Sequence, residues 1–352
     1  MALKDIIGQN KAIGILLKTI QRGRVPSSYL FAGESGIGKK LAAINLAKAL
    51  NCHGRRQKPE SEGVDACDEC SSCKKIAAGN HPDFLLISPE SDQIRIEEIR
   101  SIDDVLSMKA FEGECKTVIV DNADMLNQYA ANAFLKTLEE PPGNSLIILI
   151  SSNPDRLPDT IRSRCSRINF APLSLEACKE VIEKVIGDPP AVSGPKTGKS
   201  VKSKENKPAK TLPDDSQLST LIRLSMGRPG DAISGDLIGE REWFISLLKA
   251  MLTAEKDSWA SKEDMKKWFD FVLILLRDMA VMKISRDENH LINIDLKEYI
   301  QRLSSPMDLK VIIEYYQRLN TLKGYFNFNL NKSLTWNYTG SLLRKEMEIT
   351  HA

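Results

Sequence analysis

Short apolar runs alternate with helical patterns over roughly the first 170 residues of the chain. Four of these runs, at residues 28–32, 84–87, 117–120 and 145–150, are almost unbroken, whereas residues 40–50 place apolar residues at helical spacing. Unbroken apolar strands suit a parallel sheet that helices cover on both faces, because both faces of each strand are then buried. Strands and helices in alternation predict an α/β domain.

Beyond Pro172 the pattern becomes wholly helical, with one interruption. Residues 187–215 are rich in Lys, Ser and Pro and have no apolar periodicity, so we predict a disordered, net-basic insertion there. A solvated loop is the plainer interpretation of this insertion, and a DNA-contacting segment is the alternative. From about Trp243 to the end, amphipathic helices predict a separate all-α domain. The four tryptophans of the chain lie in this domain, either at an interface or in its own core.

Composition is typical of a soluble protein with more than one domain. The 352 residues are 42% hydrophobic and 27% charged, with a formal net charge of +2, and this length exceeds one ordinary core. No apolar run approaches the roughly 20 residues needed to span a bilayer, and the first residues do not resemble a secretion signal. We therefore expect a cytoplasmic protein. A net charge this small neither favours nor excludes nucleic acid, because a basic patch can lie within a neutral total.

A phosphate-binding loop is predicted between the strand at 28–32 and the helix at 40–50. Residues 33–40 read GESGIGKK and fit the pattern G-x-x-x-x-G-K, which requires a strand before it and a helix after it. Glycines let backbone N–H groups surround phosphate oxygens, and the N-terminus of the helix adds positive potential. Lys39 would contact the β- and γ-phosphates. The nucleotide-binding candidates in this loop are Gly33, Ser35, Gly36, Gly38, Lys39 and Lys40.

The residues that normally bind magnesium and activate water for hydrolysis are replaced. Where a Ser or Thr hydroxyl should coordinate Mg²⁺, the chain has Lys40, a cation that cannot ligate another cation. Asp121 ends the strand at 117–120 and could orient a magnesium-bound water, but Asn122 follows it, and an amide cannot accept a proton from water at neutral pH. Asp124 is expected to point elsewhere. We do not expect fast hydrolysis; the loop either binds phosphate or nucleotide, or is empty and only shapes the fold.

Four of the seven cysteines lie close together in the sequence, and they predict a structural zinc site. In a reducing compartment such clustering indicates metal ligation before disulfides. Two successive C-x-x-C steps and one more distant cysteine supply four thiolates, which fill the tetrahedral coordination of Zn²⁺ and leave no open position for chemistry. The alternatives are a redox-sensing cluster or unligated thiols. The predicted ligands are Cys52, Cys67, Cys70 and Cys73.

The order of these motifs closely resembles that of the bacterial clamp-loader AAA+ proteins. The resemblance is dense over residues 1–172 and looser beyond. Within that family the chain is more similar to the delta-prime subunit of DNA polymerase III than to the gamma/tau motor subunit. The motifs are IIGQ at residues 6–9, GESGIGKK at 33–40, the cysteines between 52 and 73, GNHPD at 79–83, IRIEEIR at 94–100, DNAD at 121–124, LKTLEEPP at 135–142 and SRC at 163–165.

The resemblance implies roles for several residues. Arg164 matches the arginine finger that reaches into a neighbouring subunit's ATP site, where a guanidinium stabilises the charge of the transition state. Asn153 matches the sensor of the γ-phosphate, although an ordinary turn residue is an equal alternative. Residues 227–232 match the second sensor segment, but Gly230 stands where motor subunits carry arginine, and Arg228 is displaced from that place.

The resemblance also implies a domain plan and partners. We expect an AAA+ P-loop domain with a parallel sheet and a zinc module (52–73) over residues 1–172. A small helical lid with the insertion (173–235) and an all-α collar (243–352) that assembles a ring would follow. The implied partners are the gamma/tau and delta subunits in a hetero-oligomeric ring, the sliding clamp and primer–template DNA.

Three hypotheses for the function follow from these observations. The first is a stationary ring subunit with little or no ATPase activity of its own, in which a role for ATP and Mg²⁺ is doubtful. The second is an ATP-hydrolysing, gamma/tau-like motor subunit, against which Lys40, Asn122 and Gly230 argue. The third is a protein that acts outside replication and binds DNA through its zinc module.

Overall fold

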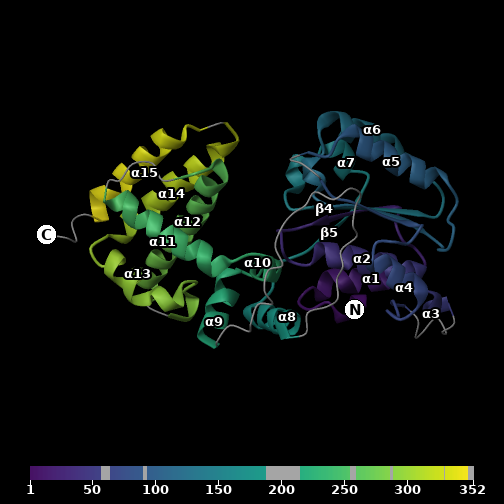
Figure 1. Cartoon of the computed structure of the whole chain (residues 1–352), viewed down its shortest axis with the longest axis horizontal. Coiled ribbons are helices and arrows are strands. Elements are labelled where there is room, and N and C mark those ends of the chain that lie inside the picture. Colours follow the sequence, from purple (N-terminus) through teal and green to yellow (C-terminus); the bar gives the residue numbers. More distant parts are fainter. Residues whose placement is uncertain are drawn as a thin grey trace. The chain divides into compact units, whose positions relative to one another are not determined.

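The chain folds into two compact units. The computed structural model describes residues 1–56, 64–89, 93–187, 215–253, 259–285, 288–328 and 330–347, so the predicted insertion lies almost wholly outside the described residues. The N-terminal unit comprises Met1–Leu212 and Gly227–Ile233, and the C-terminal unit comprises Pro213–Met226 and Ser234–Ala352 (Figure 1). The division into three domains stays a prediction.

A parallel sheet forms the centre of the N-terminal unit, as the apolar runs predict. In the described part of the chain the sheet has five strands in the order β2-β3-β4-β1-β5, and every neighbouring pair is parallel. The strand β5 was not predicted: it is a polar edge strand in which only Ile168 is buried. The strands are β1 (Ser28–Ala32), β2 (Phe84–Ile87), β3 (Lys116–Val120), β4 (Ser145–Ser151) and β5 (Ser166–Asn169).

Helices cover both faces of this sheet. In Figure 1, α5, α6 and α7 lie on one side, and α1, α2 and α4 lie on the other. On the first side, the buried Ile102 of α5 and Phe134 of α6 share a core with Val118 and Ile147 of the strands. The helices of this unit are α1 (Asn10–Gln21), α2 (Lys39–Asn51), α3 (His53–Arg56), α4 (Ser71–Ala77), α5 (Ile96–Ser107), α6 (Gln128–Glu139), α7 (Asp159–Arg162) and α8 (Leu175–Gly187), with α10 (Pro229–Ser234) at its boundary.

The described C-terminal unit is helical throughout. Its longest helix, α12 (Lys262–Ile284), begins at Ser261, whose hydroxyl accepts the backbone N–H of Asp264, and such a cap satisfies a free donor of the first turn. None of the described helices is long and apolar enough to cross a bilayer. The other α-helices are α9 (Asp215–Leu224), α11 (Leu237–Leu252), α13 (Lys297–Ser304), α14 (Leu309–Gly324) and α15 (Lys332–Met347).

Three of the four tryptophans fill the core of the C-terminal unit. Trp259, Trp268 and Trp336 are all at most 3% exposed, and the rings of Trp259 and Trp336 meet edge to face with centroids 5.0 Å apart. Trp243 is only partly buried against this core. The interpretation of the tryptophans as core residues is therefore confirmed for those three.

Candidate functional site

The predicted loop lies between β1 and α2, so its expected strand–loop–helix context is confirmed. β1 ends at Ala32, and α2 begins at Lys39, directly after Gly38. Gly36 has a φ of +73°, a left-handed conformation that favours glycine, and a Cβ there would lie 2.6 Å from the Asp231 carboxylate. A cavity of about 410 Å³ adjoins the loop. Its lining includes Ser35, Gly36, Gly38, Lys39, Lys40, Asp121 and Asn122, but neither Asn153 nor Arg164.

Lys39, the residue predicted to reach the phosphates, is turned onto the loop itself. Its ammonium donates hydrogen bonds to the carbonyl oxygens of Gly33, at 2.6 Å, and Glu34, at 2.5 Å. Burial of the side chain lowers the Lys39 pKa, and this effect outweighs the nearby carboxylates, first among them Asp121, which favour the charged form. These two carbonyls take two of the three N–H donors of the ammonium, which leaves one for a phosphate.

Lys40 and Asp121 form an ion pair at the mouth of the loop. The Lys40 Nζ lies 3.0 Å from the Asp121 Oδ2 and 3.5 Å from the Ser88 hydroxyl. Mg²⁺ requires oxygen ligands at about 2.0–2.1 Å in octahedral geometry. The residues present therefore do not fit a magnesium ion, because an ammonium replaces the hydroxyl ligand and already occupies the aspartate.

The residues after β3 also depart from a hydrolytic site. Asn122 has a φ of +49°, and its N–H donates to the Asp121 Oδ1 at 3.1 Å. The Asp124 carboxylate accepts hydrogen bonds at the end of β4 from the Ser151 hydroxyl (2.8 Å) and the Ser152 N–H (3.2 Å), and it is among the carboxylates that favour the charged form of Lys39. Asn153 is tied to this network only through its own N–H, which donates to the Ser151 hydroxyl at 3.1 Å, so its sensor role stays a prediction.

The backbone contact between Gly230 and the loop gives a physical reason for the missing arginine. The Gly230 N–H donates to the Gly36 carbonyl at 2.9 Å, and a Cβ at residue 230 would lie 2.8 Å from the Gly36 Cα. Real side chains do not approach backbone so closely, so this arrangement excludes an arginine. Arg228 is directed to carboxylates instead, with its Nε 3.4 Å from Asp231 and 3.8 Å from Glu34.

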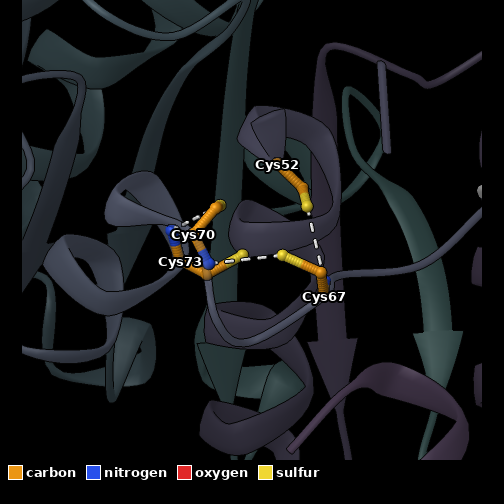
Figure 2. Close-up of side chains that lie close together, drawn as sticks. All are labelled: Cys52, Cys67, Cys70 and Cys73. Carbon is orange, nitrogen blue, oxygen red and sulfur yellow. Dashed lines mark hydrogen bonds between the residues drawn. The ribbon is translucent and has the colours of Figure 1, made fainter. Parts of the chain in front are cut away.

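The four predicted zinc ligands come together in one cluster. Cys52 follows α2, Cys70 caps α4 and Cys73 lies within α4, and the four sulfur atoms lie within 4.8 Å of one another. Figure 2 shows these sulfurs directed toward a common space between the two helices. Four thiolates around Zn²⁺ at about 2.3 Å require sulfur separations of about 3.8 Å, which this cluster can reach with small rotations. The donor set therefore fits a closed metal site.

Backbone N–H groups donate to three of the four sulfurs. The N–H groups of Cys67, Cys70 and Cys73 donate to the sulfurs of Cys52, Cys67 and Cys70, at 3.3, 3.4 and 3.5 Å. Although burial raises the pKa of Cys70, these and neighbouring donors lower it to about 6. Burial raises the pKa of Cys52 and Cys73.

The turn that carries the cysteines is anchored by a residue that sequence reasoning missed. Asp68, between Cys67 and Cys70, pairs with the buried ammonium of Lys48 on α2. Asp68 itself has a φ of +60°. A charged residue between two C-x-x-C cysteines is the only local signal that could have indicated this anchor.

Arg164 lies on the surface and has partners that the sequence did not indicate. It follows the short helix α7, and its side chain is 34% exposed. Its Nη2 donates to the Glu139 carboxylate at 2.5 Å, and its Nη1 donates to the Thr160 carbonyl at 2.8 Å. The arginine-finger role stays a prediction.

The sheet order and the loop between β1 and α2 define a P-loop domain of the AAA+ class. Residues 8–174 match the family described as "DNA polymerase III, delta subunit", and residues 242–343 match "DNA polymerase III, delta subunit, C terminal". The chain is 32% identical over 296 residues to the DNA polymerase III subunit delta' of Pseudomonas aeruginosa, covering 80% of each protein. The chain belongs to the family of DNA polymerase III delta' subunits.

Two further relatives match about half of the chain. The delta' subunit of Bacillus subtilis is 36% identical over 172 residues, which is 49% of this chain and 50% of that one. The tau subunit of Salmonella typhimurium is 32% identical over 186 residues, which is 52% of this chain and 28% of that one. The matches thus span half or less of these two relatives' own lengths.

Proposed function

We propose that this protein is a stationary subunit of a clamp loader, one that helps to load the sliding clamp onto primed DNA. In this proposal it sits in a hetero-oligomeric ring with gamma/tau and delta subunits and places Arg164 in a neighbour's ATP site. The observation that carries the proposal is a contrast within the N-terminal unit. In the chain's own loop an ammonium occupies the aspartate, with the Lys40 Nζ 3.0 Å from the Asp121 Oδ2, whereas the partly exposed Arg164 does not line the cavity beside this loop.

Three features of the loop and its neighbouring segments argue against hydrolysis by the chain itself. Lys40 stands in place of the magnesium-binding hydroxyl, Asn122 in place of the general base, and Gly230 leaves no space for a second-sensor arginine. A fast ATPase requires both a bound metal that neutralises phosphate charge and a residue that orients water. Without these groups, the N-terminal unit can still position neighbouring subunits, and it can still supply a residue to a neighbouring subunit's ATP site.

Arg164 is suited to such a trans contribution. A guanidinium has five N–H donors, and the Glu139 carboxylate and the Thr160 carbonyl take two of them, so the partly exposed side chain can donate to a γ-phosphate while Glu139 still holds it. A guanidinium supplied to a phosphoryl-transfer site in trans typically accelerates the reaction by about 10³–10⁵-fold. Arg164 can therefore matter to a neighbour's chemistry while leaving this subunit's fold unaffected.

The test is Arg164→Ala in a loader reconstituted with gamma/tau and delta subunits, clamp and primed DNA. We expect assembly to be preserved, with ATPase activity and clamp loading reduced by at least about 100-fold at the affected site. Arg162→Ala is the matched control, because Arg162 is a neighbouring arginine that pairs with Asp155 and Asp159 of its own unit. Normal activity in the Arg164→Ala loader would refute the proposal.

A gamma/tau-like motor is the second candidate, supported by the similarity to a tau subunit over 186 residues. The isolated chain decides between the two. Steady ATP turnover by the purified protein that Lys39→Ala abolishes would favour the motor. We expect no such turnover.

For the cysteine cluster we propose a structural zinc ion held by Cys52, Cys67, Cys70 and Cys73. All four ligand positions of a tetrahedral metal would be filled, so the ion would join the turn after α2 to α4 without taking part in chemistry.

A further inference from the structure

The Lys40 side chain lies where a P-loop normally brings a divalent cation to the aspartate that ends β3. Lys40 is the second residue of α2, and Asp121 follows directly after β3. Their charged atoms are 3.0 Å apart, and Ser88, just beyond the end of β2, adds an oxygen 3.5 Å from the same ammonium. Three segments that are distant in the sequence therefore supply a cation and its two oxygen neighbours.

This arrangement repeats the charge pattern of a metal site with a different cation. In a magnesium-dependent loop, a hydroxyl and a carboxylate on these two elements bind the ion together. Here Lys40 replaces the hydroxyl and supplies the positive charge itself, and the Asp121 carboxylate neutralises that charge. The Asp121 side chain is 17% exposed and that of Lys40 45%, so the pair lies at the solvent-accessible opening of the loop and not in the core.

Four carboxylates surround the two lysines of the loop. The carboxylates facing Lys39 are those of Asp121, Asp124, Glu34 and Asp231. Asp124 is bound to Ser151 and Ser152, and Asp231 lies 3.4 Å from the guanidinium of Arg228. Of the four, Asp121 is the one whose position at the end of β3 suits a metal, and the ammonium of Lys40 occupies it.

We infer that Lys40 is a built-in substitute for the divalent cation, and that its ammonium alone excludes Mg²⁺ and Mn²⁺ from this loop. The inference deepens the proposed function and rests on it only in treating the loop as non-catalytic. It identifies Lys40 as the residue that excludes the metal. Any nucleotide that this loop binds is therefore bound without a metal ion. Removing the ammonium frees Asp121 as a ligand.

The experiment measures binding of ADP to the isolated full-length chain by calorimetry, with Mg²⁺ and with EDTA. It also measures binding of Mn²⁺ in the presence of ADP by electron paramagnetic resonance. We expect the wild type to show no difference between Mg²⁺ and EDTA and no bound Mn²⁺. Lys40→Thr restores a hydroxyl and should bind ADP at least tenfold more tightly with Mg²⁺ than with EDTA. Lys40→Arg keeps a cation and should show no such gain.

Lys40→Met separates removal of the charge from addition of the hydroxyl. It should bind Mn²⁺ with ADP more weakly than Lys40→Thr but measurably above the wild type. Absence of any Mn²⁺ binding in both Lys40→Met and Lys40→Thr would overturn the inference, as would an equal gain in Lys40→Arg or a magnesium-dependent affinity in the wild type.

Urea unfolding of the same variants shows whether they fold and whether the ion pair exists in solution. Lys40→Met and Asp121→Asn should each lower the unfolding midpoint, and their double variant should lower it by less than the sum of the two shifts. Strict additivity would contradict the pairing. None of these measurements requires the loader, so their failure is distinguishable from a failure of the Arg164→Ala test.

Discussion

The guanidinium of Arg164 lies against the carboxylate of Glu139, with Nη2 2.5 Å from Oε1. Glu139 ends α6, and Arg164 follows α7, so the pair connects the ends of two different helices. A second bond to the Thr160 carbonyl, at 2.8 Å, fixes the other terminal nitrogen of the guanidinium. The arginine proposed to act on a neighbour is thus held in one orientation before any neighbour binds.

Glu139→Ala should slow the reconstituted loader without weakening its substrate binding. Loss of the carboxylate frees the Arg164 side chain, and ordering it again in the transition state costs about 1 kcal/mol. We expect kcat for ATP to fall by about 3- to 10-fold with KM unchanged, whereas Glu139→Gln, which keeps an acceptor oxygen, should be close to the wild type. Glu140→Ala removes the adjacent exposed carboxylate and is the matched control. An equal effect of both alanine variants would show a general charge effect instead.

Cys70→Ser should remove the proposed zinc ion and destabilise the N-terminal unit. Metal binding to a closed four-thiolate site contributes directly to folding, so we expect about one zinc per chain in the wild type and much less in the variant. The temperature of unfolding should fall by several degrees at least. Cys115→Ser, which changes a cysteine outside the cluster, should keep its zinc. Metal analysis without zinc in the wild type would end this proposal.

Unchanged DNA affinity after zinc removal would count against a DNA-binding module.

Asp83→Asn should destabilise the protein at neutral pH but not in acid. The Asp83 carboxylate accepts the N–H groups of Phe111, Glu112 and Gly113 at 2.7–2.8 Å. Although burial alone would raise the pKa of Asp83, these bonds lower it below its usual value. The stabilisation is therefore complete above the unfolded-state pKa of about 3.9 and is lost as the pH falls through the lower folded-state value.

Urea unfolding at several pH values checks this prediction. The free energy of unfolding of Asp83→Asn should be about 1–3 kcal/mol below that of the wild type at pH 7, and the two should converge below about pH 4. The exposed Asp104→Asn serves as the control and should differ little from the wild type at any pH. A constant difference between Asp83→Asn and the wild type down to pH 2 would contradict the assignment.

Gly230→Ala should destabilise the protein although it adds a single methyl group. The new Cβ would lie 2.8 Å from the Gly36 Cα and 2.9 Å from its carbonyl oxygen, so the loop backbone must move. Crowding of this kind typically costs about 1–3 kcal/mol, which urea unfolding can measure. Gly143→Ala is the matched control, because a Cβ there meets nothing within 4 Å. If the two variants were equally stable, the contact between residues 36 and 230 would not be tight in solution.

Local patterns were sufficient to predict most of the sheet. The four apolar runs became β1 to β4, as expected for short runs in a sheet that is covered on both faces, and the glycine loop followed β1 because its motif is contiguous. The strand β5 could not be predicted in this way. It reads Ser-Arg-Ile-Asn and buries one side chain, so its strand conformation depends on pairing with β1, which no local pattern encodes.

The candidate site, too, was predictable only in part. The sequence by itself determined that a cation, Lys40, stands where a hydroxyl belongs, and that four cysteines are spaced for one metal. Only the tertiary structure decided what the ammonium does: it pairs with Asp121 because α2 begins, and β3 ends, at the same edge of the parallel sheet. Likewise Arg164 is evident from its motif, but its partner Glu139 lies 25 residues away. Pairings of this kind depend on how strands and helices are ordered in space, and that order is fixed by burial of the whole core.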